Sequence, residues 1–196
     1  MMEREEIIKL IEELALEKNI SLEEIPEIDL YMDQVIQLFE NKYNDCKRNT
    51  EDKILTKTMI NNYAKGKLLI PIKSKKYSKE HLILMSLIYN LKGGLSLGDI
   101  KTCLNPIINQ YENGEEINLR EIYKVYLEQS KDDTESFKKD VLNRELSVKD
   151  KVKDVKNKEF EEKFLLLCSM INMSNMYRKM GEKLIDEFFE REGKDK

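Results

Sequence analysis

Apolar residues recur every three or four positions along most of this chain, and this spacing predicts amphipathic helices. The first helix is predicted over residues 3–18 and ends at Asn19; its apolar stripe consists of Ile7, Ile8, Ile11, Leu14 and Ala15. The second is predicted over residues 29–43, with Asp29 as its N-cap. Its stripe consists of Met32, Val35, Ile36 and Phe39.

A short helix is predicted after the polar loop of residues 44–53. Thr56 can cap its N-terminus, and Gly66 ends it, so it covers residues 56–65. Ile60, Tyr63 and Ala64 share the face that would pack on the preceding helix, and this leaves the other face exposed. The exposed face carries Thr58, Asn61, Asn62 and Lys65.

Residues 67–77 are compatible with extended structure and cannot form a regular helix, because Pro71 interrupts them. Ser78 then predicts the start of a helix over residues 79–92, which Gly93 and Gly94 end. A further helix is predicted from Ser96, whose pairing with Asp99 approximates a capping box.

The C-terminal half contains two further helical patterns. Residues 118–130 place Leu119, Ile122, Tyr123 and Tyr126 on one face, while the charge-dense residues 131–158 fit either a helix or a mobile linker. A long helix is predicted over residues 159–192. It carries a seam at alternating four- and three-residue steps, typical of a coiled coil: Leu166, Met170, Met173, Tyr177, Met180 and Leu184. A second stripe beside it consists of Phe160, Phe164, Leu167 and Ile171.

This long helix has two interpretations. The seam could dimerise, or the helix could fold back onto residues 118–130 within one chain. Dimerisation is our prediction, because two apolar stripes on one helix can serve both contacts. The methionines Met170, Met173, Met176 and Met180 have two interpretations of their own: a plain hydrophobic core, which is our prediction, or a small apolar effector pocket.

Composition supports a mainly α fold. Of the 196 residues, 40% are hydrophobic and 37% are charged, whereas there are only seven Gly and three Pro. The longest apolar run, residues 164–173, is about half of the ~20 residues that a membrane span requires. The chain opens on an acidic amphipathic segment rather than on a secretory signal, so a cytoplasmic location is expected.

Positive charge is concentrated in one part of an acidic protein. Residues 53–92 carry nine Lys and one acidic residue, Glu80, whereas residues 1–52 have a net charge of −9 and the whole chain −4. Clustered Lys gains affinity for DNA by releasing condensed counterions from the phosphates. A solvated charged surface is the alternative explanation for such a cluster, and the charge alone does not decide between the two.

The order of the predicted elements favours DNA binding over a solvated charged surface. A helix, a connection, a short helix, an extended basic ribbon and two further helices follow one another in the order of a winged helix-turn-helix module. The segments TKTMINNYAKGKLL, KKYSKEHL and LKGGLSLGDIKTCL resemble the DNA-binding domain of MerR-type transcriptional regulators. Residues 29–104 resemble still more closely a bacterial family known as domain of unknown function 1836, which is itself MerR-like.

The resemblance implies a dimeric DNA-binding regulator that represses by occluding a promoter or activates by distorting it. Helix 56–65 would enter the major groove, and residues 67–77, called the wing below, would lie on the flanking backbone. The residues predicted to contact DNA are Lys57, Thr58, Asn61, Asn62, Tyr63, Lys65, Lys67, Lys73, Lys75, Lys76 and Tyr77. Where MerR proteins carry an Arg-Tyr-Tyr run, this chain has Asn61-Asn62-Tyr63. The rival prediction is therefore a protein-interaction adaptor on a winged-helix scaffold.

No pattern in the chain predicts an enzyme, a cofactor or a metal site. Cys46, Cys103 and Cys168 are too far apart to form a metal or redox motif, and buried thiols are expected. The one histidine, His81, is expected to be a packing or capping residue. The chain is thus predicted to contain three parts: an N-terminal amphipathic helix (1–28), a MerR-like domain (29–112) and a helical dimerisation region (113–196).

Overall fold

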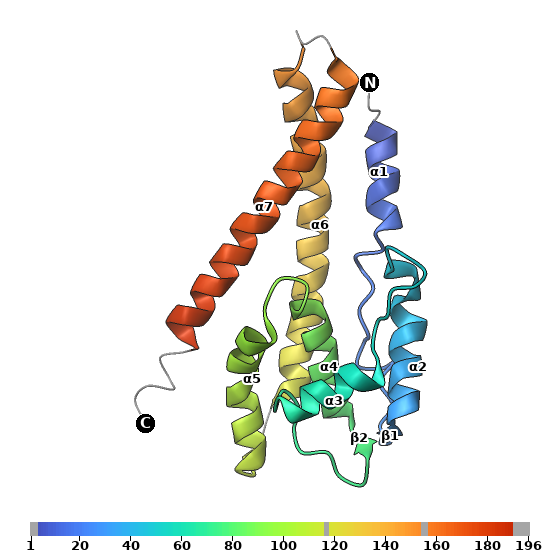
Figure 1. Cartoon of the computed structure of the whole chain (residues 1–196), viewed down its shortest axis with the longest axis vertical. Helices are drawn as coiled ribbons and strands as arrows, with labels where there is room; N and C mark the ends of the chain where they lie inside the picture. Colours follow the sequence, from blue (N-terminus) through green and yellow to red (C-terminus); the bar gives the residue numbers. More distant parts are fainter. Residues whose placement is uncertain (1–3, 116–117, 154–156, 190–196) are drawn as a thin grey trace. The chain divides into compact units, whose positions relative to one another are not determined.

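The computed structural model describes residues 4–115, 118–153 and 157–189. These residues are mainly helical and form seven α-helices with one small antiparallel sheet (Figure 1). They divide into two compact units. The central unit contains Lys18–Leu127 and the residues from Gly181 onward, and the hairpin unit contains the residues up to Glu17 together with Glu128–Met180.

The central unit holds the larger hydrophobic core. Its elements are β1 (Leu30–Tyr31), α2 (Met32–Tyr43), the 3₁₀ turn η1 (Asn44–Cys46), α3 (Lys57–Lys65), β2 (Lys76–Tyr77), α4 (Lys79–Leu91), α5 (Leu97–Glu112) and the start of α6 (Leu119–Lys151). Val35, Phe39, Ile60 and Ile83 are fully buried in this core. The hydroxyl of Tyr123 on α6 donates a hydrogen bond of 2.7 Å to the carbonyl of Ile20.

The two strands of the sheet come from segments far apart in the chain. Leu30 lies opposite Tyr77, and Tyr31 lies opposite Lys76. The prediction that Asp29 caps a helix over residues 29–43 is therefore wrong at its N-terminus, because the chain is extended until Tyr31 and α2 begins at Met32. The Gln34 side chain accepts a hydrogen bond of 2.8 Å from the backbone N–H of Tyr31, which satisfies one free donor of the helix end.

The predicted starts of three helices are confirmed. Thr56 Oγ1 accepts a hydrogen bond of 3.1 Å from the N–H of Met59 at the start of α3. At the start of α5, Ser96 and Asp99 accept from each other's backbone N–H groups, both at 3.2 Å. Helix α4 begins after Ser78, as the sequence predicts. These caps depend on residues within a single turn, which is why the sequence reveals them.

The hairpin unit consists of α1 (Arg4–Glu13), most of α6 and most of α7 (Lys158–Phe188). The prediction that the first helix reaches Lys18 is wrong: α1 ends at Glu13, and Ala15 has a left-handed φ of 50°. Residues 131–151 are helical, as one of the two interpretations had it, and they continue α6 without a break. Residues 190–192 of the predicted long helix lie outside the described residues.

A small core holds the three helices of this unit together. Ile7 and Ile11 of α1, Val141 of α6 and Leu166 of α7 are buried against one another. Among the described residues, no helix is both long enough and apolar enough to cross a membrane.

Candidate nucleic-acid interface

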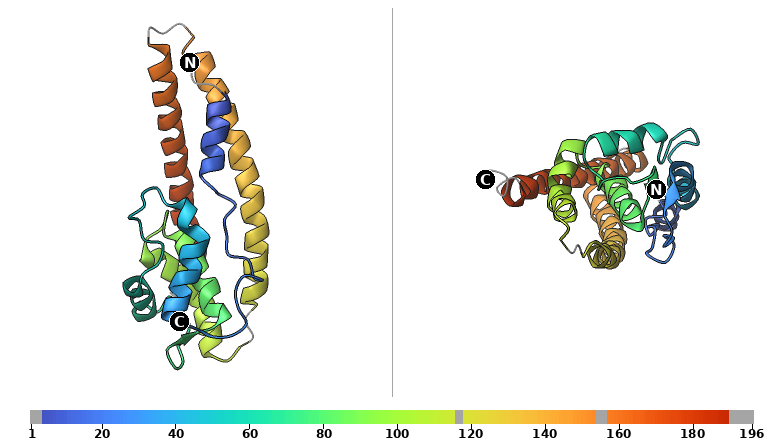
Figure 2. Two further views of the ribbon diagram at one scale, coloured as in Figure 1. Left: turned by 90° about the vertical axis from the view of Figure 1, so that its right-hand side faces the viewer. Right: turned by 90° about the horizontal axis from the view of Figure 1, so that it is seen from below.

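Helix α3 has one buried face and one exposed face. Ile60 is 0% exposed and Tyr63 is 4% exposed, so both belong to the core. Thr58, Asn61, Asn62 and Lys65 are all exposed, which is the division that the apolar spacing predicts. Within the central unit, α3 lies across α4, with α2 on one side and α5 on the other (Figures 1 and 2). An anchored short helix thus presents amides, a hydroxyl and an ammonium group to solvent.

The end of α3 is built differently from the prediction. Gly66 ends the helix, but its φ is −72°, and Lys67 adopts the left-handed conformation with φ 58°. The N–H of Leu68 donates to the carbonyl of Tyr63 at 2.9 Å, and that of Lys67 to the carbonyl of Ala64 at 3.1 Å, which is a Schellman end. Gly66 is needed for space, because a Cβ there would lie 2.6 Å from Cδ1 of Leu68.

The wing is mostly irregular rather than a continuous ribbon. Leu68, Leu69 and Ile70 are buried, so its first part belongs to the core, and its strand β2 covers only Lys76–Tyr77. The tip is a tight turn, in which the N–H of Lys76 donates to the carbonyl of Lys73 at 3.0 Å.

Both central residues of this turn have positive φ, 53° at Ser74 and 58° at Lys75, as in a type I′ turn. Such turns favour Gly and Asn, and neither is present. The turn nevertheless carries two exposed lysines, Lys73 and Lys75, at its tip.

The nine lysines of residues 53–92 differ in their surroundings. Lys65, Lys67, Lys73 and Lys75 are exposed. The ammonium group of Lys76 lies 5.3 Å from the centre of the Tyr31 ring, which is a cation–π contact. The sequence did not predict this contact, because Tyr31 falls within the helix predicted over residues 29–43.

Other lysines are engaged by acidic side chains or by the backbone. Lys57 pairs with Asp33 at 2.8 Å, and both side chains are largely exposed. Lys79 is buried and pairs with Glu27 at 2.5 Å. Lys92 donates to the carbonyl of Ile54 at 3.3 Å. Lys79 is therefore unsuited to phosphate contact, and neither Lys79 nor Lys92 was predicted to make one.

The two tyrosines of the predicted interface are core residues. Tyr63 and Tyr77 are each 4% exposed, and burial raises the pKa of both phenols. Tyr77 packs edge-on against His81, with ring centres 5.7 Å apart. Both residues therefore serve mainly to pack the domain.

His81 is a capping and packing residue, as predicted. Its Nδ1 accepts a hydrogen bond of 3.0 Å from the N–H of Ser78, and its Nε2 donates to the carbonyl of Ile70 at 3.2 Å. Burial lowers the pKa of the imidazole, so the ring is neutral near pH 7. No group of three or more His, Cys, Asp or Glu residues within the described ranges is arranged to hold a metal ion.

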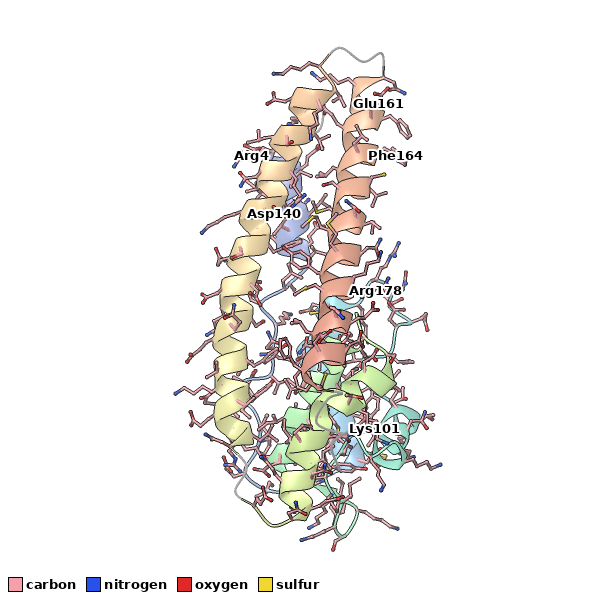
Figure 3. All side chains as sticks on the ribbon, turned by 90° about the vertical axis from the view of Figure 1, so that its left-hand side faces the viewer. Arg4, Lys101, Asp140, Glu161, Phe164 and Arg178 are labelled. Carbon is pink, nitrogen blue, oxygen red and sulfur yellow. The ribbon has the colours of Figure 1, made fainter. Side chains whose placement is uncertain are left out.

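The predicted dimerisation seam divides into two parts. Leu166 is buried, and Met170 packs partly against it, so this part of the seam already has partners on α1 and α6. Met173 is half-buried, whereas Tyr177, Met180 and Leu184 are exposed. The second stripe is also exposed: Phe160 by 60%, Phe164 by 50%, Leu167 by 57% and Ile171 by 56%. Figure 3 shows Phe164 on the side of α7 turned away from α6.

Of the three thiols, Cys46 and Cys103 are half-buried, as expected of packing residues. Burial raises the pKa of both thiols. Cys168 is exposed, contrary to the expectation of a buried thiol.

The fold and the exposed short helix define a mainly helical domain with a small wing. Comparison with known protein families matches residues 20–126 to the family described as Domain of unknown function (DUF1836). The match covers more than half of the chain, and the protein belongs to this family. This confirms the predicted resemblance to domain of unknown function 1836. No curated protein matches the chain. No solved structure matches it either.

Proposed function

We propose that this protein is a cytoplasmic, dimeric DNA-binding regulator of transcription with a MerR-like winged helix-turn-helix domain. The observation that carries the proposal is α3, a helix fixed by Ile60 and Tyr63 whose other face is polar and exposed. Readout of DNA sequence requires such side chains on a helix that the fold holds rigidly.

The proposed contacts divide into those that read bases and those that position the protein. Asn61 and Asn62 can each pair with N6 and N7 of adenine, and Thr58 can contact a thymine methyl group or a phosphate. Lysines at both ends of α3 and on the wing would contact phosphates, which adds affinity without reading sequence. These lysines are Lys57, Lys65, Lys67, Lys73, Lys75 and Lys76.

Fluorescence anisotropy with genomic DNA fragments tests the proposal. The protein should bind all duplexes at low salt and a subset of them at physiological salt. Replacing Asn61 and Asn62 together by Ala should remove this preference and leave the low-salt affinity for unrelated duplexes within about threefold, because only the base contacts are lost. No binding to any duplex at low salt would contradict the proposal.

The alternative function is a protein-interaction adaptor on the same scaffold. The ion pair between Lys57 and Asp33 favours it, because it partly neutralises the start of α3. The absence of Arg from α3 and the acidic residues 1–52 favour it too. The same anisotropy titration separates the two functions, since an adaptor would not bind DNA at either salt concentration.

Dimerisation through α7 is part of the proposal. The exposed stripe of Phe160, Phe164, Leu167 and Ile171 leaves about 400 Å² of apolar side chain in water, close to the largest apolar patch of a typical monomer. The rings of Phe160 and Phe164 are stacked, with centres 5.7 Å apart, so this stripe is already ordered for contact. If two chains align their α7 helices side by side, the apolar side chains of each stripe would be buried against those of the other.

Sedimentation velocity tests the dimer. The wild-type protein should sediment as a dimer of 23.3 kDa chains. The variant with Phe164→Glu and Leu167→Glu should sediment as a monomer, because an interface core does not tolerate unpaired charge. Lys179→Glu, a change at an exposed position on another face of the same helix, is the control and should leave the dimer intact. A monomeric wild-type protein at about 50 μM would contradict this part of the proposal, because stable interfaces of standard size have dissociation constants well below that concentration.

A further inference from the structure

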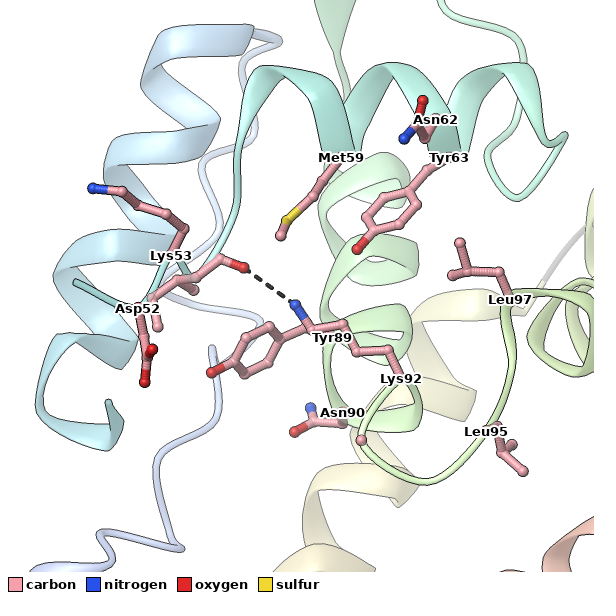
Figure 4. A pocket seen from close by; sticks show the side chains of 12 residues that line it. Asp52, Lys53, Met59, Asn62, Tyr63, Tyr89, Asn90, Lys92, Leu95 and Leu97 are labelled. Atoms are coloured by element: carbon pink, nitrogen blue, oxygen red, sulfur yellow. Dashed lines mark hydrogen bonds between the residues drawn. The ribbon is translucent and has the colours of Figure 1, made fainter. Parts of the chain in front are cut away.

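A pocket of 650 Å³ lies in the central unit against α3 (Figure 4). Three segments form it: α3 itself, the segment of residues 52–54 that precedes α3, and the stretch from the end of α4 to the start of α5. This volume falls within the range of small-molecule sites. Two residues of the predicted interface, Asn62 and Tyr63, also line the pocket, and the predicted interface does not account for the rest of the lining.

Most of the lining is apolar or aromatic. Met59 and Tyr63 come from α3, Tyr89 from α4, and Leu95 and Leu97 from the connection to α5. Figure 4 shows the Met59 side chain and the Tyr63 hydroxyl directed toward the space that the Lys92 ammonium group also faces. Burial raises the pKa of Tyr63, so its hydroxyl is a hydrogen-bond donor at neutral pH.

Lys92 is the unusual member of the lining. It is half-buried, and its Nζ donates to the carbonyl of Ile54 at 3.3 Å and lies 4.6 Å from the centre of the Tyr89 ring. Burial lowers the pKa of Lys92, and no acidic side chain offsets this effect. Within the described part of the chain, no carboxylate forms an ion pair with it.

The ammonium group therefore has unused binding capacity. It has three N–H donors, and one of them is accepted by Ile54. The acidic residue of the lining, Asp52, accepts instead from the backbone N–H of Asn49 at 2.9 Å, and Figure 4 shows its carboxylate turned away from Lys92. The hydrogen bond to Ile54, which links residues 52–54 to α4, uses one of the three N–H donors of Lys92. The other two donors face the pocket.

We propose that this pocket binds a small organic monocarboxylate, with its carboxylate on Nζ of Lys92 and its aromatic or aliphatic body among Met59, Tyr89 and Leu97. The Lys92 ammonium group and the Tyr63 hydroxyl match one negative charge, because Figure 4 shows the ammonium group of the other lining lysine, Lys53, turned away from the space they face. No Arg, the residue that pairs with phosphate through two parallel hydrogen bonds, is among the lining residues. The proposal does not depend on DNA binding, because it concerns the isolated protein.

Methyl NMR of the full chain tests the proposal. With ¹³C-methyl methionine, the Met59 signal reports on the pocket, and Met176 in the hairpin unit serves as an internal control. The probes are indole-3-acetate and octanoate, with neutral indole-3-acetamide as the matched compound. The acids should shift the Met59 signal saturably and leave Met176 unchanged. The amide should bind at least about 10-fold more weakly, the usual value of a charge-assisted hydrogen bond.

Two variants complete the test. Lys92→Met keeps an apolar stem of similar length and should abolish the difference between acid and amide. Lys101→Met, which removes a lysine outside the pocket, should preserve that difference. The proposal is overturned if neither acid shifts Met59 saturably, or if acid and amide bind equally to the wild-type protein. Persistence of the difference in Lys92→Met would overturn it too. Should Lys92→Met fail to fold, the comparison of acid with amide on the wild-type protein still decides.

Discussion

Replacing Ile60 by Ala removes the best-buried side chain that fixes α3 to the core. Ile60 is 0% exposed, and with Tyr63 it makes up the buried residues of a helix of nine residues. Helices this short are unstable in water without tertiary contacts. The orientation of α3 therefore depends on these two side chains, and the proposed interface depends on that orientation.

The expected loss of stability follows from the burial. Ile→Ala removes three carbon atoms, each worth about 0.8 kcal/mol when fully buried. The cavity that remains adds a further contribution, which gives about 3 kcal/mol in total. Asn61→Ala is the matched control one residue along, where the side chain is exposed, and it should change the free energy of unfolding by less than about 0.5 kcal/mol.

Urea unfolding followed by circular dichroism at 222 nm measures both values. The m-value must be the same in wild type and variants, because a changed slope would mean that the unfolding reaction itself differs. If Asn61→Ala cost as much free energy as Ile60→Ala, the assigned faces of α3 would be wrong, and with them the proposed interface.

Two further predictions concern the cap of α4 and the wing. Burial lowers the pKa of His81 below its ordinary value of 6.5, so the unfolded chain takes up a proton there before the folded protein does. The free energy of unfolding should therefore fall as the pH drops below about 6.5. Urea titrations at several pH values should show a smaller fall for His81→Asn than for the wild type. An equal pH dependence in both proteins would contradict this prediction. Ser74→Asn should raise the free energy of unfolding by about 0.5 kcal/mol, because Asn tolerates the positive φ of this turn better than Ser does. A lower midpoint in urea would refute the turn assignment.

Much of the central unit could be predicted from the sequence because its signals are local. The Thr56 cap, the end at Gly66 and the pairing of Ser96 with Asp99 each depend on residues within one turn. The buried and exposed faces of α3 follow from helical spacing alone. The family resemblance, too, depended on the order of such local signals.

The errors arose where distant segments interact. The residue type of Asp29 favours a helix cap, but the next two residues, Leu30 and Tyr31, pair with β2, which follows α3 in the chain. Nothing near Ala15 predicts its left-handed φ, which ends the first helical segment early. Periodicity predicts which residues share a face of a helix, but not which other segment covers that face.

The sequence did not predict the surroundings of individual lysines either. Lys79 pairs with Glu27, and Lys92 donates to the carbonyl of Ile54, although each partner lies in a distant segment of the chain. The pocket beside α3 is formed by three such segments. Charge counting along the chain therefore overestimates how many lysines are available to DNA, whereas the exposed lysines of the wing tip and of the end of α3 remain available.

The salt dependence of DNA binding tests the central claim most directly. Log Kd is measured against log salt concentration for the wild type, for Lys73→Gln with Lys75→Gln, and for Lys101→Gln with Lys124→Gln, a pair outside the proposed interface that loses the same charge. The claim predicts that the wing-tip pair lowers the slope by about 1.8, the value for two phosphate contacts, and that the control pair leaves it unchanged. Equal slopes for the two double variants would contradict it.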